Sequence, residues 1–323
     1  EDREPIAIVG FGFHASQNSE CSVTLYVPKK AELNSCSLYS DSGNIQASDL
    51  TASDFGLGCD YGDVTLKNIK GKEQLRLNLG SGNLNADTLS GKTAAVYNDS
   101  GNISLKSGTF DDLHLENDYG DVRLDGTAVK NASDLTLDSG HITVADSTLG
   151  AARIYNESGN ITLNKTNGTS MEVTAEYGDV SFTDTEVSDV GTFTLDSGNF
   201  SANTSTVKAI TVKNDSGNVL LNQFSSESAV FTLSYGDLDL TATKLGSFDC
   251  KSENGNVSIQ LPDPFDSYGF NLHTEYGEIA LPSAKETALI SEEEDSSEVS
   301  YRTNSEAKHK IQVECENGNI RIG

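Results

Sequence analysis

The stretch that decides the fold is Asp41-Ser42-Gly43-Asn44-Ile45, because the same turn returns along the whole chain. Its glycine recurs at a nearly constant interval as far as Gly255, and then after the longer steps to Gly277 and Gly318. A fixed period of roughly 20 residues is typical of a solenoid, in which each repeat packs against its neighbours only. The repeat glycines are Gly43, Gly62, Gly82, Gly101, Gly120, Gly140, Gly159, Gly178, Gly198, Gly217, Gly236, Gly255, Gly277 and Gly318.

Within each unit, apolar residues alternate with polar ones on both sides of the glycine. With the glycine counted as position 0, apolar residues fall at −5, −3, +2 and +4, as in Leu135, Leu137, Ile142 and Val144 around Gly140. This alternation predicts two short strands with one buried face. Its phase changes across the turn, so we expect the glycine to have a positive φ angle.

The size of the coil follows from chain length. At ~3.3 Å per residue, a unit of about 19 residues gives a perimeter of about 60 Å, which inward side chains can fill. The Tyr-Gly-Asp turns recur at three times this interval, as from Tyr61 to Tyr119. A coil of that length would be too wide to fill, so the longer spacing marks a super-repeat of three coils. The predicted fold is therefore all-β: a single-stranded parallel β-helix, or β-solenoid, with coils of about 19–20 residues.

The ends of the chain depart from the repeat. We expect residues 1–22 to form one or more N-terminal cap strands and residues 23–323 to form the β-helix domain. The long step from Gly277 to Gly318 is interpreted as two units, with a degenerate coil near residues 283–310 whose turn has eroded at Ser296-Ser297. When these irregular end segments are counted with the regular repeats, the sequence predicts about fifteen or sixteen coils in all.

Composition restricts the partners. The net charge of −27 disfavours nucleic acid and direct binding to anionic membranes. No run of about 18 apolar residues predicts a membrane-spanning helix. The chain begins at Glu1 rather than methionine, which is consistent with an exported protein whose leader has been removed. Five cysteines without a CxxC motif argue against a disulfide framework, although a Cys21–Cys36 bridge is an alternative.

The repeated Ser-Gly-Asn-Ile and Tyr-Gly-Asp-Val turns resemble the DUF4097 family of bacterial adhesins. The phrase Ile259-Gln260-Leu261-Pro262, followed fifteen residues later by Gly277, carries the same resemblance, as does the terminal stretch 316–320. The similarity extends from about residue 20 to residue 323. It implies a β-helix on the exported side of a bacterial envelope, and it carries no catalytic residues over to this chain.

Two polar columns flank the glycine corner, an acidic one at −2 and an Asn/Asp one at +1. One interpretation is calcium held between coils by carboxylate and amide oxygens. The other, which we favour, is that these residues accept hydrogen bonds at the turns and face water. The candidate calcium ligands are Asp99, Asp118, Asp138, Asp196 and Asp215 at −2, and Asp121 and Asp179 at +1.

Tyrosines occupy position −1 in every third coil, where the other coils mostly have serine. Their rings could stack on sugars, and packing over the neighbouring serines is the competing interpretation. The candidate ligand-binding residues are Tyr61, Tyr119, Tyr177, Tyr235 and Tyr276. Asparagines at the inward −3 position are expected to be structural, with their amides hydrogen-bonded inside the coil; they are Asn98, Asn117, Asn156 and Asn214.

No catalytic constellation emerges, because the five histidines fall in different coils and at different positions of the unit. We therefore expect a non-enzymatic extracellular protein of the cell surface or envelope, an adhesin or a scaffolding and sensing module that binds through the solenoid surface. The alternatives are a carbohydrate-binding module and, less favoured, a glycan-degrading β-helix enzyme. The expected partner is an envelope protein or a glycan. No cofactor is expected apart from the calcium alternative, and self-association through exposed coil edges is a further alternative.

Overall fold

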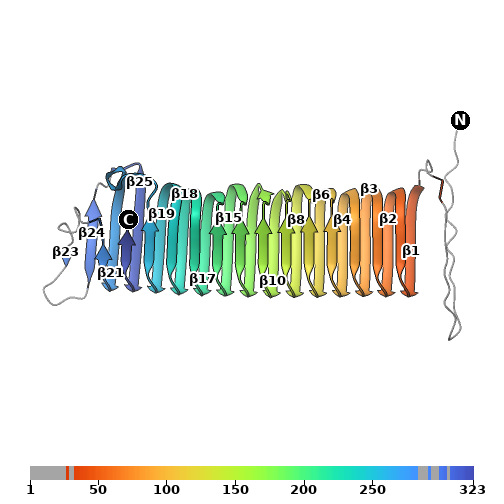
Figure 1. The fold of residues 1–323 in the computed structure, drawn as a ribbon, viewed down its shortest axis with the longest axis horizontal. Coiled ribbons are helices and arrows are strands. Elements are labelled where there is room, and N and C mark those ends of the chain that lie inside the picture. Colours follow the sequence, from red (N-terminus) through yellow and green to blue (C-terminus); the bar gives the residue numbers. More distant parts are fainter. Residues whose placement is uncertain (1–26, 29–32, 283–289, 292–297, 304–305) are drawn as a thin grey trace.

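The computed structural model describes residues 27–28, 33–282, 290–291, 298–303 and 306–323. The expected cap strands at residues 1–22 lie outside this described part. Strands make up 79% of the structure, which is a parallel β-solenoid of about 12 turns with coils about 19 residues long (Figure 1). The all-β prediction and the coil length are therefore confirmed, whereas the count of about fifteen or sixteen coils was too high because the expected extra coils do not form in the described residues.

The strands follow one another with short corners between them. In chain order they are β1 (Leu33–Ser42), β2 (Ile45–Tyr61), β3 (Val64–Ser81), β4 (Leu84–Ser100), β5 (Ile103–Lys106), β6 (Thr109–Tyr119), β7 (Val122–Asp125), β8 (Ala128–Ser139), β9 (Ile142–Ala145), β10 (Ala151–Ser158), β11 (Ile161–Asn164), β12 (Asn167–Gly168), β13 (Ser170–Tyr177), β14 (Val180–Thr183), β15 (Glu186–Ser197), β16 (Phe200–Asn203), β17 (Thr206–Ser216), β18 (Val219–Tyr235), β19 (Leu238–Asn254), β20 (Val257–Gln260), β21 (Tyr268–Tyr276), β22 (Ile279–Ala280), β23 (Ile290–Ser291), β24 (Val299–Thr303), β25 (His309–Asn317) and β26 (Ile320–Ile322). The one helix among the described residues is the 3₁₀ turn η1 (Phe265–Ser267), and no described helix is long and apolar enough to cross a membrane.

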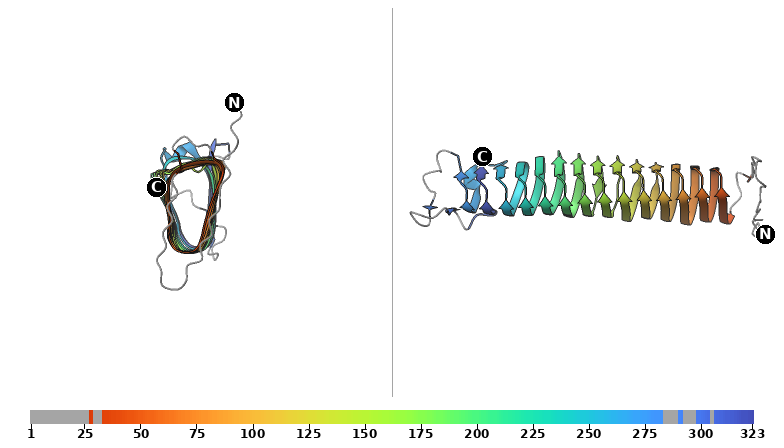
Figure 2. Two further views of the ribbon diagram at one scale, coloured as in Figure 1. Left: turned by 90° about the vertical axis from the view of Figure 1, so that its right-hand side faces the viewer. Right: turned by 90° about the horizontal axis from the view of Figure 1, so that it is seen from below.

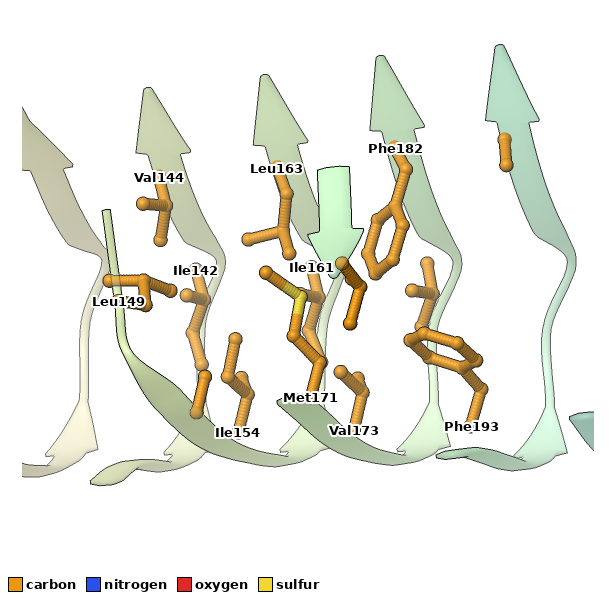
Figure 3. Packing of buried hydrophobic residues seen from close by; sticks show 14 of the residues in the cluster. Ile142, Val144, Leu149, Ile154, Ile161, Leu163, Met171, Val173, Phe182 and Phe193 are labelled. Carbon is orange, nitrogen blue, oxygen red and sulfur yellow. The ribbon is translucent and has the colours of Figure 1, made fainter. Parts of the chain in front are cut away.

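Equivalent residues of successive coils lie side by side in parallel register. Ile142 pairs with Ile161, and Ile161 pairs with Val180, so the +2 residues form one column. From Val64 onward every +2 residue is buried, and only Ile45 in the first coil is half-buried. Figure 3 shows this column facing residues such as Val173 across the interior of the coil. The period of the sequence therefore specifies one continuous hydrophobic core.

The asparagines at −3 are buried, and their side chains donate hydrogen bonds to the backbone of the glycine corner from inside the coil. In Asn98, Asn117, Asn156 and Asn214, Nδ2 donates to the carbonyl oxygen of the glycine in its own turn at 2.8–3.0 Å. The same nitrogen donates to the glycine carbonyl of the preceding coil at 3.1–3.4 Å. A buried carbonyl oxygen without a partner is costly, so each of these amides satisfies two of them. The structural role predicted for these residues is confirmed.

A second corner lies six residues after each repeat glycine from Gly43 to Gly217, and the sequence did not reveal it. The residue there has φ between 48° and 60° although it is usually not glycine. The next position is a buried hydroxyl in several coils; Thr185 Oγ1, for example, donates to the carbonyl oxygen of Thr183 at 3.1 Å. The corner residues are Asp49, Asn68, Thr88, Ser107, Gly126, Asp146, Lys165, Asp184, Thr204 and Gln223.

At this second corner we expect Thr204→Asn to stabilise the protein. Thr204 is β-branched and exposed with φ 50°, a conformation that asparagine tolerates better. The free energy of unfolding in urea should rise by about 0.5–1 kcal/mol. The reverse exchange at the equivalent position, Asn68→Thr, is the control and should lower it by at least as much, because it also removes the hydrogen bond from Asn68 Nδ2 to Oδ1 of Asp49 at 2.7 Å. Equal effects of the same sign would contradict the strain argument.

The C-terminal coils do not stack in sequence order. β25 pairs on one side with β19 and on the other with β21, and β26 likewise lies between β20 and β22. The coil of Gly318 is therefore inserted between the coils of Gly255 and Gly277. Figure 2 shows this end of the solenoid, where β24 continues the sheet by pairing antiparallel with β21.

This order differs from the one expected, in which the long step between Gly277 and Gly318 held a degenerate coil near residues 283–310. The described part of that stretch contains β23 and β24, which pair antiparallel with each other, so it forms no further coil. Ser296-Ser297 lies outside the described residues. The inserted order has a physical reason. β25 and β26 form backbone hydrogen bonds with the coil on each side, so two strand edges that would otherwise be unpaired are both satisfied.

The cysteines in the described part of the chain are free and buried. Cys36, Cys59, Cys250 and Cys315 form no disulfide. Cys21, the other half of the alternative Cys21–Cys36 bridge, lies outside the described residues. Burial raises the pKa of Cys315 to about 12, which keeps this thiol protonated and unreactive at neutral pH.

Candidate functional site

The glycine corner is fixed by two separate requirements on its central residue. Gly159 has φ +129°, a conformation in which side chains are strained. A Cβ atom built on it would also lie 2.0 Å from the carbonyl oxygen of Gly140 in the preceding coil. The same close approach repeats along the column of glycines from Gly62 onward. The positive φ predicted from the change of phase is confirmed for the repeat glycines from Gly43 to Gly255, and the corner backbone is closely stacked along the axis.

Just after the glycine, the +1 side chains form a hydrogen-bonded ladder outside the corner. The side chain of each member accepts a hydrogen bond from the backbone N–H of its counterpart in the next coil, at 2.8–3.0 Å. Where histidine replaces Asn or Asp, Nδ1 of His141 accepts in the same way. The ladder comprises Asn44, Asp63, Asn83, Asn102, Asp121, His141, Asn160, Asp179, Asn199, Asn218, Asp237, Asn256 and Asn319.

Two of the candidate calcium ligands belong to this ladder. Oδ1 of Asp121 accepts from the N–H of His141 at 2.9 Å, and Oδ1 of Asp179 accepts from Asn199 at 2.8 Å. These carboxylates therefore link coils through hydrogen bonds. Among the residues that the structure describes, no three His, Cys, Asp or Glu side chains are grouped so that they could hold a metal ion. Calcium binding at the corner stays the untested alternative.

The other five candidates lie in the −2 column on the opposite side of the corner. Asp99, Asp138 and Asp196 are exposed, while Asp118 and Asp215 are partly exposed. Asp215 lies 3.6 Å from Nζ of Lys213. Partial burial, together with the charges of Asp138 and Asp99, raises the pKa of Asp118. The column is thus a row of like charges held at the spacing of the coils.

We expect Asp118→Asn to stabilise the protein slightly at neutral pH. Because the folded-state pKa is raised, the native protein binds this proton more tightly than the unfolded chain, and the ionised group destabilises the fold. Solvent screens this largely exposed group, so the gain in unfolding free energy should be only a few tenths of a kcal/mol. The difference between variant and wild type should vanish as the pH falls below about 4, and shrink in concentrated salt. Urea unfolding over this pH range measures it; a gain that grows in acid would contradict the assignment.

The tyrosines at −1 are largely exposed at the corner. Tyr61, Tyr119, Tyr177, Tyr235 and Tyr276 are between 61% and 66% exposed. Each side of the row is polar, with the −2 acidic column on one side and the +1 ladder on the other. The structure thus brings all five predicted residues onto one edge of the solenoid. We call this set the tyrosine row.

Other tyrosines, at position −4, join neighbouring coils by hydrogen bonds that the sequence did not indicate. Tyr155 donates from its hydroxyl to Oε1 of Glu176 at 2.6 Å, and Tyr39 donates to Oδ2 of Asp60 at 2.8 Å. The hydrogen bond to Glu176 and partial burial raise the pKa of Tyr155 to about 12. In both pairs the acceptor is the −2 acid of the following coil. The sequence contains the same Tyr–acid spacing in both pairs, but only the stacking of the coils shows that the two side chains meet.

A second surface feature lies on an outer face of the sheet, around His114. Nδ1 of His114 lies 3.1 Å from Oδ2 of Asp134, and its ring lies 5.3 Å from that of Tyr97. The guanidinium of Arg76 lies 5.6 Å from the centre of the Tyr97 ring. These residues come from four successive coils, and an open hollow of about 290 Å³ lies beside His114. Sequence alone could not assemble this cluster, because its members share only a register.

Comparison with known proteins gives one match. The model of the Toastrack DUF4097 family matches residues 1–147 and 141–323, so that the two matches together span the chain. No curated protein matches it, and no solved structure matches it. The solenoid is a repeat scaffold that carries the tyrosine row along one corner.

Proposed function

The chain belongs to the Toastrack DUF4097 family, and from that scaffold we propose that it is a non-enzymatic adhesin of the bacterial cell surface that binds its partner along the tyrosine row. The observation that carries the proposal is the exposure of all five tyrosines on one rigid edge. Tyrosine is enriched at binding surfaces, because its ring offers rigid apolar area and its hydroxyl a hydrogen-bonding group. Their position on stacked coils fixes their spacing before any partner binds.

The charge of the chain supports an extracellular partner that is neither nucleic acid nor an anionic membrane. The net charge of −27 repels both, and the tyrosine row is itself bordered by acids. Localisation at the cell surface follows from the family resemblance and is part of the proposal. Antibody labelling of intact source cells, with labelling of opened cells as the control, would test it.

Binding through the tyrosine row can be tested by exchanging all five tyrosines for serine, the residue that occupies the same position in most other coils. We expect the binding of labelled protein to purified bacterial envelope fragments to fall at least tenfold, with the urea unfolding midpoint unchanged. The matched control is Leu220→Ser with Val190→Ser, two exposed apolar residues outside the row, 53% and 44% exposed. Undiminished binding by the five-serine variant would refute the proposal.

A carbohydrate-binding module is the second candidate, and the exposure of the tyrosines favours it. Aromatic faces next to amide and carboxylate groups suit sugars, which present both apolar ring faces and hydroxyls. A glycan-degrading enzyme is the least favoured alternative. It would convert soluble glycan with time, whereas a binding module would retain it unchanged, so product analysis after incubation separates the two.

A further inference from the structure

We propose that the tyrosine row is a periodic track for a neutral linear glycan that lies along the solenoid axis. The inference rests on the proposed function, since it assigns a chemical class to the partner of the same edge. It is carried by three observations: the spacing of the rings, their isolation from one another, and the charge beside them.

The first observation is that the spacing is three coils throughout. Tyr61, Tyr119, Tyr177 and Tyr235 are evenly spaced in the sequence, but Tyr276 follows Tyr235 after a shorter interval. In sequence order the fifth tyrosine would break the period. In the structure Tyr235 pairs with Asn254, Asn254 pairs with Asn317, and Asn317 pairs with Tyr276. The inserted C-terminal coil therefore places Tyr276 three coils beyond Tyr235.

The row thus has an even period of about 14 Å and a length of about 58 Å, at ~4.8 Å per coil. A ligand that uses several tyrosines must itself be extended and repetitive along the axis. Globular partners do not present contacts at a constant interval over such a length. A linear polymer does, because each of its repeating units offers the same face.

The second observation is that the rings are isolated. Between consecutive tyrosines the −1 position holds two small polar residues, such as Ser139 and Ser158 between Tyr119 and Tyr177. A specific protein interface needs about 800 Å² on each partner with an apolar core depleted of charge. The tyrosine row has no such core, because the −2 position lies one residue before each tyrosine and is mostly acidic, and a ladder residue lies two residues after it. A slender chain that contacts one ring at a time suits it better.

Hydrogen-bonding groups beside the rings suit a glycan in particular. The serine hydroxyls can donate to or accept from sugar hydroxyls, and the second carboxylate oxygen of each ladder aspartate can accept from them, while the CH face of a pyranose covers the tyrosine ring. In each tyrosine coil the +1 residue is acidic, as in Asp121 beside Tyr119 and Asp179 beside Tyr177. A carboxylate accepts hydrogen bonds from neighbouring hydroxyls more strongly than an amide does.

The third observation is charge. Acidic residues occupy position −2 along most of the row, with Gly80 and Ser234 as the exceptions, and the protein carries a net charge of −27. An anionic polymer along this edge would be repelled at most of the coils. The proposed glycan therefore carries no anionic groups. Several weak ring contacts on one chain act together, so affinity should rise steeply with the number of tyrosines that the glycan spans.

The test uses the full chain and a panel of immobilised polysaccharides: β-glucan, chitin, mannan and galactan as neutral probes, and polygalacturonate as the anionic probe. We expect retention on at least one neutral polymer and none on polygalacturonate. With soluble oligosaccharides of the retained polymer, affinity should rise about tenfold or more when the oligomer becomes long enough to span two tyrosines. Single Tyr177→Ser should lower the affinity for the polymer several-fold.

The sharpest variant moves one tyrosine by one coil. Ser158→Tyr combined with Tyr177→Ser keeps the composition, charge and number of tyrosines, but changes the two neighbouring intervals from three and three coils to two and four. Affinity for the polymer should fall as far as in Tyr177→Ser alone, while affinity for an oligomer that spans a single ring stays as in wild type. Unchanged urea unfolding would establish that the fold is intact.

Several results would overturn the inference. They are a lack of retention on every neutral polysaccharide, preferential binding of polygalacturonate, and wild-type polymer affinity in the shifted variant. If the five-serine variant loses envelope binding while wild type retains no neutral glycan, the adhesin proposal stands and the glycan assignment fails. If envelope binding by the wild type is abolished by protease treatment of the fragments, the partner is a protein.

Discussion

Replacing Gly159 by valine should cost at least about 3 kcal/mol of unfolding free energy, the largest effect expected of any single substitution in the solenoid. The backbone at φ +129° strains any residue with a Cβ atom, and that atom would lie 2.0 Å from the carbonyl oxygen of Gly140. Relief of this clash requires neighbouring coils to separate. The hydrogen bond from the Gly140 N–H to Ser158 and that from the Gly159 N–H to Tyr177 would then weaken. Urea unfolding followed by circular dichroism measures the loss.

Gly126→Asn is the matched control for Gly159→Val. Gly126 also has a positive φ of 60°, but it lies at the second corner, where a Cβ atom would meet no atom closer than 4.0 Å. Equivalent positions in other coils hold Asn and Asp, so this change should alter stability by less than about 0.5 kcal/mol. If the two substitutions cost the same, the close stacking of the corner is not what requires glycine at position 159.

Deleting residues 309–323 should unfold the C-terminal end and leave the rest of the solenoid folded. β25 and β26 are the shared partners of the coils on either side, so their loss leaves both edges without hydrogen bonds. Because a solenoid is held together by contacts between neighbouring coils, the damage should stay local. Hydrogen exchange should show lost protection in residues 268–276 and retained protection in residues 64–235. The exposed edge of β19 should also promote association of the truncated chain.

A synthetic peptide of residues 309–323 provides the control. Added to the truncated chain, it should restore protection of residues 268–276, because both of the edges that receive it are parallel strands of the correct register. A peptide in which Val313 and Ile320 are replaced by aspartate should fail, since both side chains are buried in the complete protein. Protection of residues 268–276 in the truncated chain without peptide would mean that the two coils close directly on each other.

The features that sequence predicted are those that repeat in one dimension. Apolar residues at fixed distances from each glycine established the coil, its length and its core, and an amide at the inward position identified Asn156 as structural. Stacking then follows from the period, because equivalent residues of successive coils must meet. The location of the tyrosines on one edge is part of the same argument.

What sequence could not predict depends on tertiary arrangement. The second corner contains residues such as Thr204 and Gln223, which carry no turn signal, because stacking imposes a conformation that they would avoid alone. The position of the Gly318 coil in the stack was also not predictable. The repeat pattern specifies the shape of a coil, but it does not specify which coils will pack on either side of it. The exposure of the tyrosine row required the structure for the same reason: serine neighbours allow a ring to lie flat or to project.

The inserted C-terminal coil has a mechanical consequence. Tension applied at Gly323 reaches first a strand that is bonded on both sides, β26 between β20 and β22, so the load is shared by two ladders. A last strand at an open edge would instead peel away along a single ladder. This arrangement places the tensile load inside the stack, where extraction of the strand must shear both of its ladders together.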